Sequence, residues 1–527
     1  MAILRFSKFI SLFLLFSVAN MCIGNAHASE NANAQGLISC LIGGGVKNVT
    51  AKSYSAPGAY DSLLNFSLQN LRYAEKSVLK PYAVIVPESR EQVQKAVQCC
   101  IVNEWQILVR SGGHSYEGLS STAQDPDFVI IDLMKLDRVD VDMKSKTAWV
   151  ESGATVGQLY AAIADKTSRY GFPAGVCPTI GVGGHFSGGG LGLLTRRYGL
   201  AADHVINALL VGKDGKVVDR KGMGMDVFWA IRGGGGGSFG VVLAWQIRLV
   251  KVPPKVTVFN VNRAGSDNVT RLVQRWQEFA PHAHKNLFVR AVVFGGKPEV
   301  KVTLNGMFLG SLHKFVKLVN KGFPEMGLVA GDCKETDWIG GMIYTAVNNG
   351  YSADFRNRFL PTKSYFKIKS DFVTSPISTL GLAEAWKIME EQPNSIMILA
   401  PLGGIMDQIP SYQLPFPHRA GYLYDIQYVV TWDNAANDNQ SMAWIRKFYD
   451  YMAPHVSKSP RAAYVNYIDL DLGTNPGNHG GVSMRQAKLW GERYFGGNFE
   501  RLVHVKSKFD PRNIFRNAQS IPALPYE

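Results

Sequence analysis

The 527-residue sequence lacks several features that would place it in a common class of protein. Beyond the N-terminus it has no apolar run of about 20 residues, the length a membrane-spanning helix needs, so we expect no membrane span. It has no tract of five or more Lys and Arg residues, so its formal charge of +14 is scattered and does not indicate nucleic-acid binding. Internal repeats and low-complexity segments are also absent. Its 46% hydrophobic content is ample for buried cores, which excludes intrinsic disorder.

Cysteine is scarce, and one of the six cysteines, Cys22, lies in a segment with the parts of a secretory signal peptide. Arg5 and Lys8 precede an apolar stretch, and Ala26-His27-Ala28 supplies the small residues of a cleavage site. We predict that residues 1–28 are a signal peptide and that the mature protein is secreted. The five remaining cysteines are an odd number, so at least one thiol has no intramolecular disulfide in an oxidising compartment.

Four Asn-x-Ser/Thr motifs follow the predicted signal peptide, and each is an acceptor for N-glycosylation in a secreted protein. They begin at Asn48, Asn65, Asn268 and Asn439. We therefore predict a glycoprotein.

The pattern of apolar and turn-forming residues predicts a first α+β unit between residues 80 and 251. Strands are predicted at 82–87, 105–110, 127–132, 147–151 and 239–250, and helices at 89–99 and 156–166. Ser89, followed three residues later by Gln92, predicts a capping box at the first helix. Val252-Pro253-Pro254 then indicates a domain boundary.

Residues 255–465 have a different pattern, which predicts a second α+β domain. Its predicted strands include 301–309, 395–401 and 422–432, and its predicted helices include 268–279, 312–321 and 440–451. From residue 466 the chain resumes the Gly, Asn and aromatic composition of the first half. We therefore expect the C-terminal stretch to return to the first domain and close it.

Three glycine-rich segments carry the strongest functional signal. They are Arg110-Ser-Gly-Gly-His-Ser-Tyr-Glu-Gly118, Cys177-Pro-Thr-Ile-Gly-Val-Gly-Gly-His-Phe-Ser-Gly-Gly-Gly190 and Arg232-Gly-Gly-Gly-Gly-Gly-Ser-Phe-Gly240. None contains the Gly-Lys-Ser/Thr of a Walker A loop, and none is a Gly-x-Gly-x-x-Gly turn with a downstream ribose-binding acid. A Rossmann dinucleotide site is therefore disfavoured. Backbone N–H groups in such turns can still line a pyrophosphate, although most glycine-rich loops only serve tight turns.

The combination of motifs is more specific than any one of them. The glycine-rich segments occur together with Lys80-Pro-x-x-x-x-x-Pro87, Asp226-Val-Phe-Trp-Ala-Ile-Arg232, Tyr464-Val-Asn-Tyr-Ile-Asp-Leu-Asp-Leu-Gly473 and Phe515-Arg-Asn-Ala-Gln-Ser-Ile-Pro522. This set resembles the plant berberine bridge enzyme family, within the vanillyl-alcohol-oxidase group of flavoproteins, to which cannabinoid acid synthases also belong. The resemblance covers essentially the whole mature chain.

The resemblance implies an α+β fold with two domains, of the vanillyl-alcohol-oxidase or PCMH type. The FAD-binding domain would comprise residues 29–252, with its core from about residue 77. Residues 253–465 would form the substrate domain, an antiparallel sheet covered by helices, and residues 466–527 would return to the FAD domain. We expect a monomer located in the apoplast, another extracellular space or the vacuole.

The resemblance also implies that FAD is attached at two points, through His114 to the flavin 8α-methyl and through Cys177 to C6. A His on a Gly-flanked turn can present its imidazole to a ligand, and a thiolate is a natural nucleophile for an electron-poor ring. Taken alone, each residue would more often be structural. The other residues predicted to bind FAD are Arg110, Ser111, Gly112, Gly113, Ser115, Tyr116, Thr179, Gly181, Val182, Gly183, Gly184, His185, Gly188, Leu191, Gly237, Val242, Asn466 and Asn517. No metal is expected.

The family disulfide would join Cys40 to Cys99. Cys100 and Cys333 would then be buried free thiols, and every cysteine of the mature chain would have a role.

The resemblance points to Tyr467 as the catalytic base. A phenol has a pKa of about 10 and needs a nearby cation or hydrogen bond to act as a base at neutral pH. The residue after this Tyr is commonly Arg in the family but is Ile468 here, so Tyr467 would be a poorer base. Asp425 and Gln427 share one face of the predicted strand 422–432. The resemblance implies that this strand carries polar catalytic or substrate-contacting groups, so both are candidate catalytic residues, and Asp425 is the second candidate for a base or cation stabiliser. A half-buried Tyr and a solvent-facing Asp are the alternative roles.

Two apolar residues are informative, one about the polarity of the substrate and one about the access of oxygen to the flavin. Leu191 stands where Tyr is frequent in the family, and that Tyr belongs to the active-site pair of relatives that oxidise monolignols and sugars. Leu191 therefore suits a less polar aromatic or terpenoid-like substrate, although filling volume is the default role of Leu. Ile180 lies where the family tunes oxygen access with a branched apolar side chain.

We expect an FAD-dependent oxidase of a plant specialised metabolite, such as an alkaloid or a prenylated phenol. Hydride would pass to flavin N5, the product could cyclise, and O₂ would reoxidise the flavin and give H₂O₂. Three alternatives stay open: a carbohydrate or monolignol oxidase, a flavin-containing pericyclase that performs cycloaddition without net redox change, and a non-catalytic flavoprotein.

Overall fold

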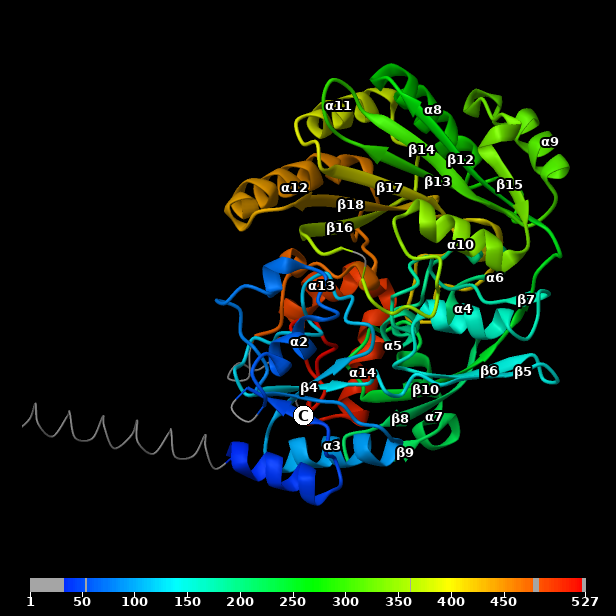
Figure 1. Cartoon of the computed structure of the whole chain (residues 1–527). Coiled ribbons are helices and arrows are strands. Elements are labelled where there is room, and N and C mark those ends of the chain that lie inside the picture. The colour runs from blue at the N-terminus through cyan, green and yellow to red at the C-terminus, as the bar shows by residue number, and fades with distance from the viewer. Residues whose placement is uncertain (1–32, 53–54, 361, 477–482, 524–527) are drawn as a thin grey trace, which may run out of the picture.

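The computed structural model describes residues 33–523 except 53–54, 361 and 477–482. The predicted signal peptide, residues 1–28, lies outside the described residues. Two units are stacked in Figure 1: a lower unit built from the N-terminal half and the C-terminal segment, and an upper unit built around one large sheet. Helices and mixed sheets confirm the predicted α+β class.

The lower unit begins with a four-stranded sheet in the order β1-β2-β4-β3. Its strands are β1 (Val49–Ala51), β2 (Ala83–Ile85), β3 (Gln106–Arg110) and β4 (Phe128–Asp132). β2 and β3 both run parallel to β4, and helix α3 (Arg90–Val102) connects them. Ser89 caps α3 by accepting from the Gln92 N–H at 3.3 Å, but the Gln92 side chain accepts from the Glu88 N–H, so the predicted capping box is only half formed.

A five-stranded antiparallel sheet in the order β5-β6-β10-β8-β9 completes the core of the lower unit. The strands are β5 (Val139–Asp142), β6 (Thr147–Glu151), β8 (Val205–Val211), β9 (Val217–Val218) and β10 (Val241–Arg248). Helix α4 (Val156–Ala164) follows β6, and a complete capping box between Thr155 and Gln158 fixes its start. β11 (Val250–Lys251) pairs with β7 (Tyr170–Gly171) beside this sheet.

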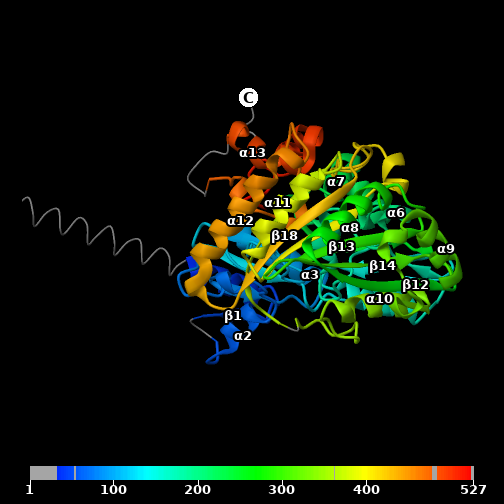
Figure 2. The ribbon, with the colours of Figure 1, turned by 90° about the horizontal axis from the view of Figure 1, so that it is seen from above.

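The upper unit is one seven-stranded antiparallel sheet in the order β15-β12-β14-β13-β17-β18-β16. The strands are β12 (Val256–Ala264), β13 (Leu287–Phe294), β14 (Lys301–Phe308), β15 (Cys333–Thr336), β16 (Tyr365–Val373), β17 (Ser395–Pro401) and β18 (Tyr424–Trp432). Helices α8 (Ser266–Phe279), α9 (Leu312–Gly322), α11 (Thr379–Glu390) and α12 (Asp438–Met452) cover the face that is turned away from the lower unit (Figures 1 and 2). In α8 the buried residues Val269, Val273 and Trp276 recur every three or four positions, the spacing of a helix with one apolar face.

The C-terminal segment lies in the lower unit, where helices α13 (Met484–Phe495) and α14 (Phe499–Phe509) pack together (Figure 1). Helix α14 also contacts α7 (Arg220–Ala230), which belongs to the first half of the chain. The Lys506 ammonium of α14 is fully buried and donates to Asp510 at 2.7 Å and to the carbonyls of Ser238 and Phe515. These bonds join the C-terminal segment to the glycine-rich loop before β10.

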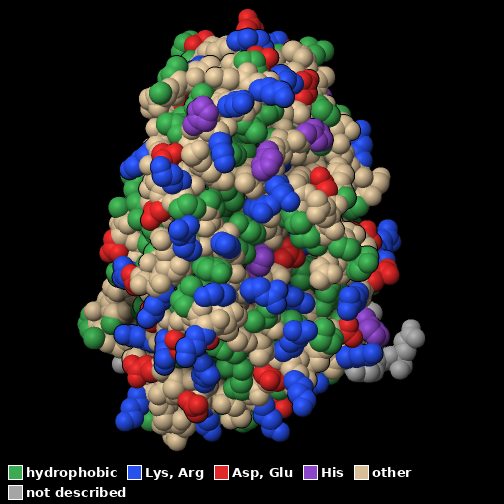
Figure 3. Space-filling view, turned by 90° about the vertical axis from the view of Figure 1, so that its right-hand side faces the viewer, with side chains coloured by type: hydrophobic (Ala, Val, Ile, Leu, Met, Phe, Trp, Pro, Cys, Tyr) green, Lys and Arg blue, Asp and Glu red, His purple; other side chains and the backbone are tan. Residues whose placement is uncertain are grey.

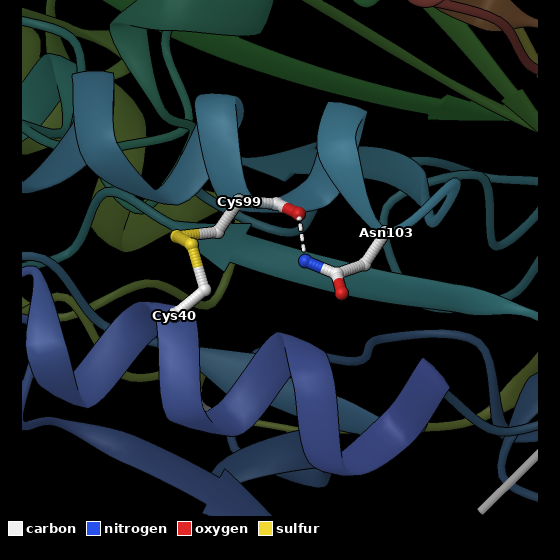
Figure 4. Close-up of a disulfide and its surroundings, with 3 residues drawn as sticks. All are labelled: Cys40, Cys99 and Asn103. Carbon is white, nitrogen blue, oxygen red and sulfur yellow. Dashed lines mark hydrogen bonds between the residues drawn. A yellow bond between two sulfur atoms is a disulfide. The ribbon is translucent and has the colours of Figure 1, made fainter. Parts of the chain in front are cut away.

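The predicted disulfide between Cys40 and Cys99 is present, with the two Cα atoms 5.7 Å apart (Figure 4). It joins the helix formed by residues 33–43 to α3, where the Asn103 side chain also bonds to the Cys99 carbonyl. Cys100 is a buried free thiol, as predicted. The prediction that Cys333 is buried is wrong: it lies half exposed on β15, because β15 is the edge strand of the large sheet.

The surface has mixed charge. Lys and Arg side chains are spread over the face in Figure 3, with acidic and neutral residues between them. In the part of the chain that the structure describes, no helix is long and apolar enough to cross a membrane. Of the four predicted glycosylation sites, Asn48 and Asn439 are exposed, whereas Asn65 and Asn268 are half-buried.

Candidate active site

A cavity of about 630 Å³ lies between the two units, and all three parts of the chain line it. The lower unit contributes the three glycine-rich segments, the large sheet contributes residues of β13, β17 and β18, and the C-terminal segment contributes residues 464–468 and 516–519. Most predicted site residues face it: Ser111, Gly112, Gly113, His114, Ser115, Tyr116, Cys177, Gly181, Gly183, Gly184, His185, Leu191, Gly237, Val242, Asp425, Gln427, Asn466, Tyr467 and Asn517.

His114 is held at the cavity wall by two side chains. Gln69 Nε2 lies 2.9 Å from its Nδ1, and Thr179 Oγ1 lies 2.9 Å from its Nε2. Burial lowers the pKa of His114 to about 4 although Thr179 opposes the shift, so the ring is neutral at pH 7. A neutral imidazole keeps a nitrogen lone pair, which is the form needed to bond to carbon.

Cys177 lines the same cavity and has no disulfide partner in the described structure. Burial raises the pKa of its thiol, whereas a hydrogen bond from Tyr351 and the positive charge of Arg290 act in the opposite direction. His114 and Cys177 therefore present two nucleophilic atoms to one cavity from two different loops.

The glycine-rich segments leave space in the cavity wall that side chains would fill. A Cβ atom added to Gly184 would meet nothing within 4 Å and would project into the cavity. Gly237 has φ +78°, a left-handed conformation that favours glycine, so the loop can turn its backbone toward the cavity. Gly112 packs so closely on the second loop that its Cβ would lie 2.2 Å from the Gly181 nitrogen. A backbone-lined wall beside two nucleophiles fits FAD, whose pyrophosphate accepts N–H bonds.

Four residues predicted to bind FAD have no place in the cavity wall: Arg110, Thr179, Val182 and Gly188. The Arg110 guanidinium is fully buried, bonded to Asp132 at 2.5 Å and to the carbonyls of Leu63 and Leu64, so it stabilises the sheet edge beneath the first loop. Thr179 acts on His114, as described above. A Cβ on Gly188 would lie 2.0 Å from Asn466 Oδ1, so this glycine allows the C-terminal segment to approach.

Three of the four tyrosines that line the cavity pack against one another. The rings of Tyr116 and Tyr467 stack at 5.9 Å, and Tyr464 meets Tyr467 edge-on at 4.9 Å. The Tyr464 hydroxyl accepts from the N–H groups of Gly190 and Leu191, so it organises the second glycine-rich loop. Burial raises the pKa of Tyr467 well above its ordinary value, and the Asp425 charge adds to the effect. Tyr467 is therefore a neutral phenol at pH 7.

Asp425 and Gln427 lie on one face of β18, as the strand alternation predicts, and both line the cavity. The Gln427 amide donates to the Tyr116 hydroxyl at 3.1 Å. The Asp425 carboxylate is only 3% exposed and has no salt-bridge partner among the described residues. Burial raises its pKa to about 7, and Arg290 partly offsets the rise. Asp425 can therefore accept or release a proton near neutral pH.

Several cavity residues were not identified from the sequence. They include Phe288, Arg290, Asn349, Tyr351, Ile396, Ile398, Val429, Tyr464 and Gln519. Most come from strands of the large sheet, where a run of apolar residues indicates a strand but not which face meets the cavity. Arg290 carried the only usable signal, because a single charge within the apolar strand Leu287–Phe294 is unusual.

Comparison with known proteins agrees with this architecture. The FAD binding domain family matches residues 81–220, and the berberine and berberine like family matches residues 463–522. Tetrahydroberberine oxidase from Berberis wilsoniae is 42% identical, with 97% of this chain and 98% of that protein covered. Monolignol oxidoreductase AtBBE-like 13 from Arabidopsis thaliana is 44% identical, with 87% of each covered. The structure of berberine bridge enzyme from Eschscholzia californica matches with a TM-score of 0.89 at 40% identity, covering 93% of this chain and 100% of that chain. The protein therefore belongs to the berberine bridge enzyme-like family of FAD-binding oxidoreductases.

Proposed function

We propose that the protein is an FAD-dependent oxidase of a plant specialised metabolite and that Asp425 accepts the substrate proton. FAD, when bound, would supply the redox chemistry of a two-electron oxidase, in which a substrate C–H bond is oxidised by loss of a hydride and O₂ is reduced to H₂O₂. The observation that carries the proposal is the buried Asp425 carboxylate, which has no salt bridge to any described residue and faces the cavity that His114 and Cys177 also line.

Asp425 is better matched to proton transfer than Tyr467, which the sequence had favoured. A general base works best when its pKa lies near the operating pH, and the pKa of Asp425 is about 7. The pKa of Tyr467 lies well above 10. We assign Tyr467 the role of holding the substrate by a hydrogen bond from its neutral hydroxyl, beside the ring of Tyr116. Gln427 fixes Tyr116 from the sheet.

His114 and Cys177 would hold the cofactor covalently. The neutral imidazole and the unpaired thiol, on separate loops of one wall, support attachment at two points. Two tethers would fix the flavin without enclosing it, which leaves the cavity wide for a bulky substrate.

The cavity wall favours a substrate with a large apolar part. Leu191, Phe288, Ile396, Ile398 and Val429 all face it. Apolar walls with a few polar groups are typical of sites for small organic molecules. We therefore favour an alkaloid, a prenylated phenol or a similar compound over a sugar. The domain limits, the removal of residues 1–28, glycosylation and a final location in the apoplast or vacuole are part of the same proposal.

Anaerobic mixing of the purified holoprotein with fractionated plant metabolites tests the proposal. A substrate should bleach the visible flavin absorbance, and admission of air should restore the colour with H₂O₂ formed. Product formation without bleaching or O₂ uptake would identify a pericyclase, and bleaching by cellobiose or coniferyl alcohol would identify a carbohydrate or monolignol oxidase. No bleaching by any fraction would favour a non-catalytic flavoprotein.

Asp425→Asn should slow bleaching by about 10²- to 10⁴-fold, the usual contribution of a general base. Asp433→Asn is the matched control, because Asp433 is an exposed carboxylate just beyond the end of β18. Equal loss in both variants would contradict the role of Asp425.

A further inference from the structure

Arg290 and Asp425 lie in one row across the large sheet and face the same cavity. Ala291 pairs with Leu399, so the same register places Arg290 level with Ala400, and Ala400 pairs with Asp425. Two strand spacings separate the two charged residues, about 9.5 Å between their backbones. The residue between them carries only a methyl group. The row therefore presents a cation and a carboxylate to the cavity with open space between them.

The Arg290 guanidinium is oriented by neutral acceptors. Its Nε donates to Asn305 Oδ1 at 3.1 Å, and one Nη donates to Asn349 Oδ1 at 3.2 Å. Among the described residues, no carboxylate lies within salt-bridge distance of Arg290. Two amides fix the direction of the group, and Asp425 acts on its charge only from a distance, across the row.

A cation that no described carboxylate contacts, in a largely apolar cavity, favours an anionic ligand. A charged group removed from water is costly unless a counter-charge and hydrogen bonds replace the water. Burial lowers the pKa of Arg290, and the charges of Cys177, Tyr467 and Asp425 act in the opposite direction without cancelling the effect of burial. Guanidinium groups bind anionic oxygens with two N–H bonds when their orientation is fixed beforehand.

We propose that Arg290 is the recognition site for an anionic oxygen of the substrate, either a carboxylate or an ionised phenol. The proposal rests on the proposed oxidase function and narrows its substrate class to acids and acidic phenols rather than cationic amines. The anionic group would bind at Arg290 while the carbon that loses hydrogen lies nearer to Asp425, one strand spacing beyond Ala400.

Binding of small probes to the holoprotein tests the proposal without turnover. Benzoate, 4-nitrophenolate and neutral benzamide are titrated by isothermal calorimetry, in a buffer above neutrality where 4-nitrophenol is ionised. Benzoate, 4-nitrophenolate or both should bind more tightly than benzamide, and the anion that binds identifies the source of the charge. If neither anion exceeds benzamide, the proposal is overturned.

Arg290→Met should weaken anion binding by about 10- to 100-fold, the value of a charge-assisted hydrogen bond, and leave benzamide unchanged. Arg290→Lys should retain part of the affinity, because it restores the charge without the planar fork. Arg271→Met is the matched control, since Arg271 is exposed on the outer helix α8. Equal loss in the Arg271 variant, or no loss in either Arg290 variant, would overturn the assignment.

Two further measurements distinguish anion recognition by Arg290 from a role of this residue in cofactor binding. The ligand-free Arg290→Met holoprotein should keep the wild-type visible spectrum, and a changed spectrum would assign Arg290 to the cofactor instead. Asp425→Asn should tighten benzoate binding, because it removes a like charge from the same row. Failure of the oxidase proposal is seen independently, as a flavin that no metabolite fraction bleaches.

Discussion

Replacing Lys367 with Met tests a buried charge cluster that connects the two units behind the active site. Lys367, on β16, is 2% exposed and bonds to Glu117 and, at 2.7 Å, to Asp469. Lys369 pairs with Asp469 at 2.6 Å and with Asp471 at 2.9 Å. Burial alone would lower the pKa of Lys367, but the neighbouring carboxylates raise it, so the ammonium is charged at neutral pH.

The expected loss in the free energy of unfolding depends on which partners the two carboxylates bonded to Lys367 retain after the substitution. Asp469 retains Lys369, whereas Glu117, which is 3% exposed, loses the one cation that contacts it among the described residues and keeps the bond from the Tyr73 hydroxyl. Removing one partner of a buried pair costs about 3–5 kcal/mol, because the other charge is left buried. At roughly 2 cal/mol/K of unfolding entropy per residue, a chain of this length loses about 3–5 °C in Tm.

Thermal unfolding followed by near-ultraviolet circular dichroism measures the effect. Lys387→Met is the control, because Lys387 pairs with Glu384 on the exposed surface of α11 and such a pair contributes less than about 1 kcal/mol. Adding Glu117→Gln to Lys367→Met removes the orphaned charge and should restore about 1–3 kcal/mol. A Lys367 variant as stable as the Lys387 control, or a double variant less stable than the single one, would refute this account of the cluster.

Three other predictions concern the cavity and the fold. The kcat/KM of the oxidase should rise with pH through about 7, because only deprotonated Asp425 accepts a proton, and Asp425→Asn should remove this limb from the pH profile. Acid-precipitated protein should stay yellow, and peptide mass mapping should find FAD on both His114 and Cys177; Cys177→Ala should keep the colour through His114 alone. Replacing Cys40 and Cys99 by Ser should lower the free energy of unfolding by about 2–5 kcal/mol in urea titrations, since the disulfide closes a loop of 59 residues.

Local patterns were sufficient to predict many elements of the fold. The strand 395–401 and the helix 312–321 match β17 (Ser395–Pro401) and α9 (Leu312–Gly322) within one residue. Both elements carry their own signal, a short apolar run in one case and a helical repeat after Ser311 in the other. Strand β13, which carries Arg290, was not predicted, nor were the C-terminal helices α13 and α14.

The candidate site was predictable only where its residues form a motif. The loops around His114 and Cys177 are recognisable because their chemistry lies in consecutive residues. Lys367 contacts Glu117, which is 250 positions away, and no local pattern reports such a contact. The pKa of Asp425 likewise depends on burial beneath the other unit, which the strand sequence does not encode.

The part of the cavity wall that fits FAD and the row of Arg290, Ala400 and Asp425 come from different units of the protein. The wall that fits FAD is made from loops of the lower unit, whereas Arg290, Ala400 and Asp425 belong to the upper sheet. Residues on a sheet face project at fixed spacings, so one of them can be exchanged without moving the backbone of its neighbours. Cofactor loading and substrate charge preference are therefore separable properties of this protein. A substitution at position 290 or 425 should alter which ligands bind while FAD is bound as before.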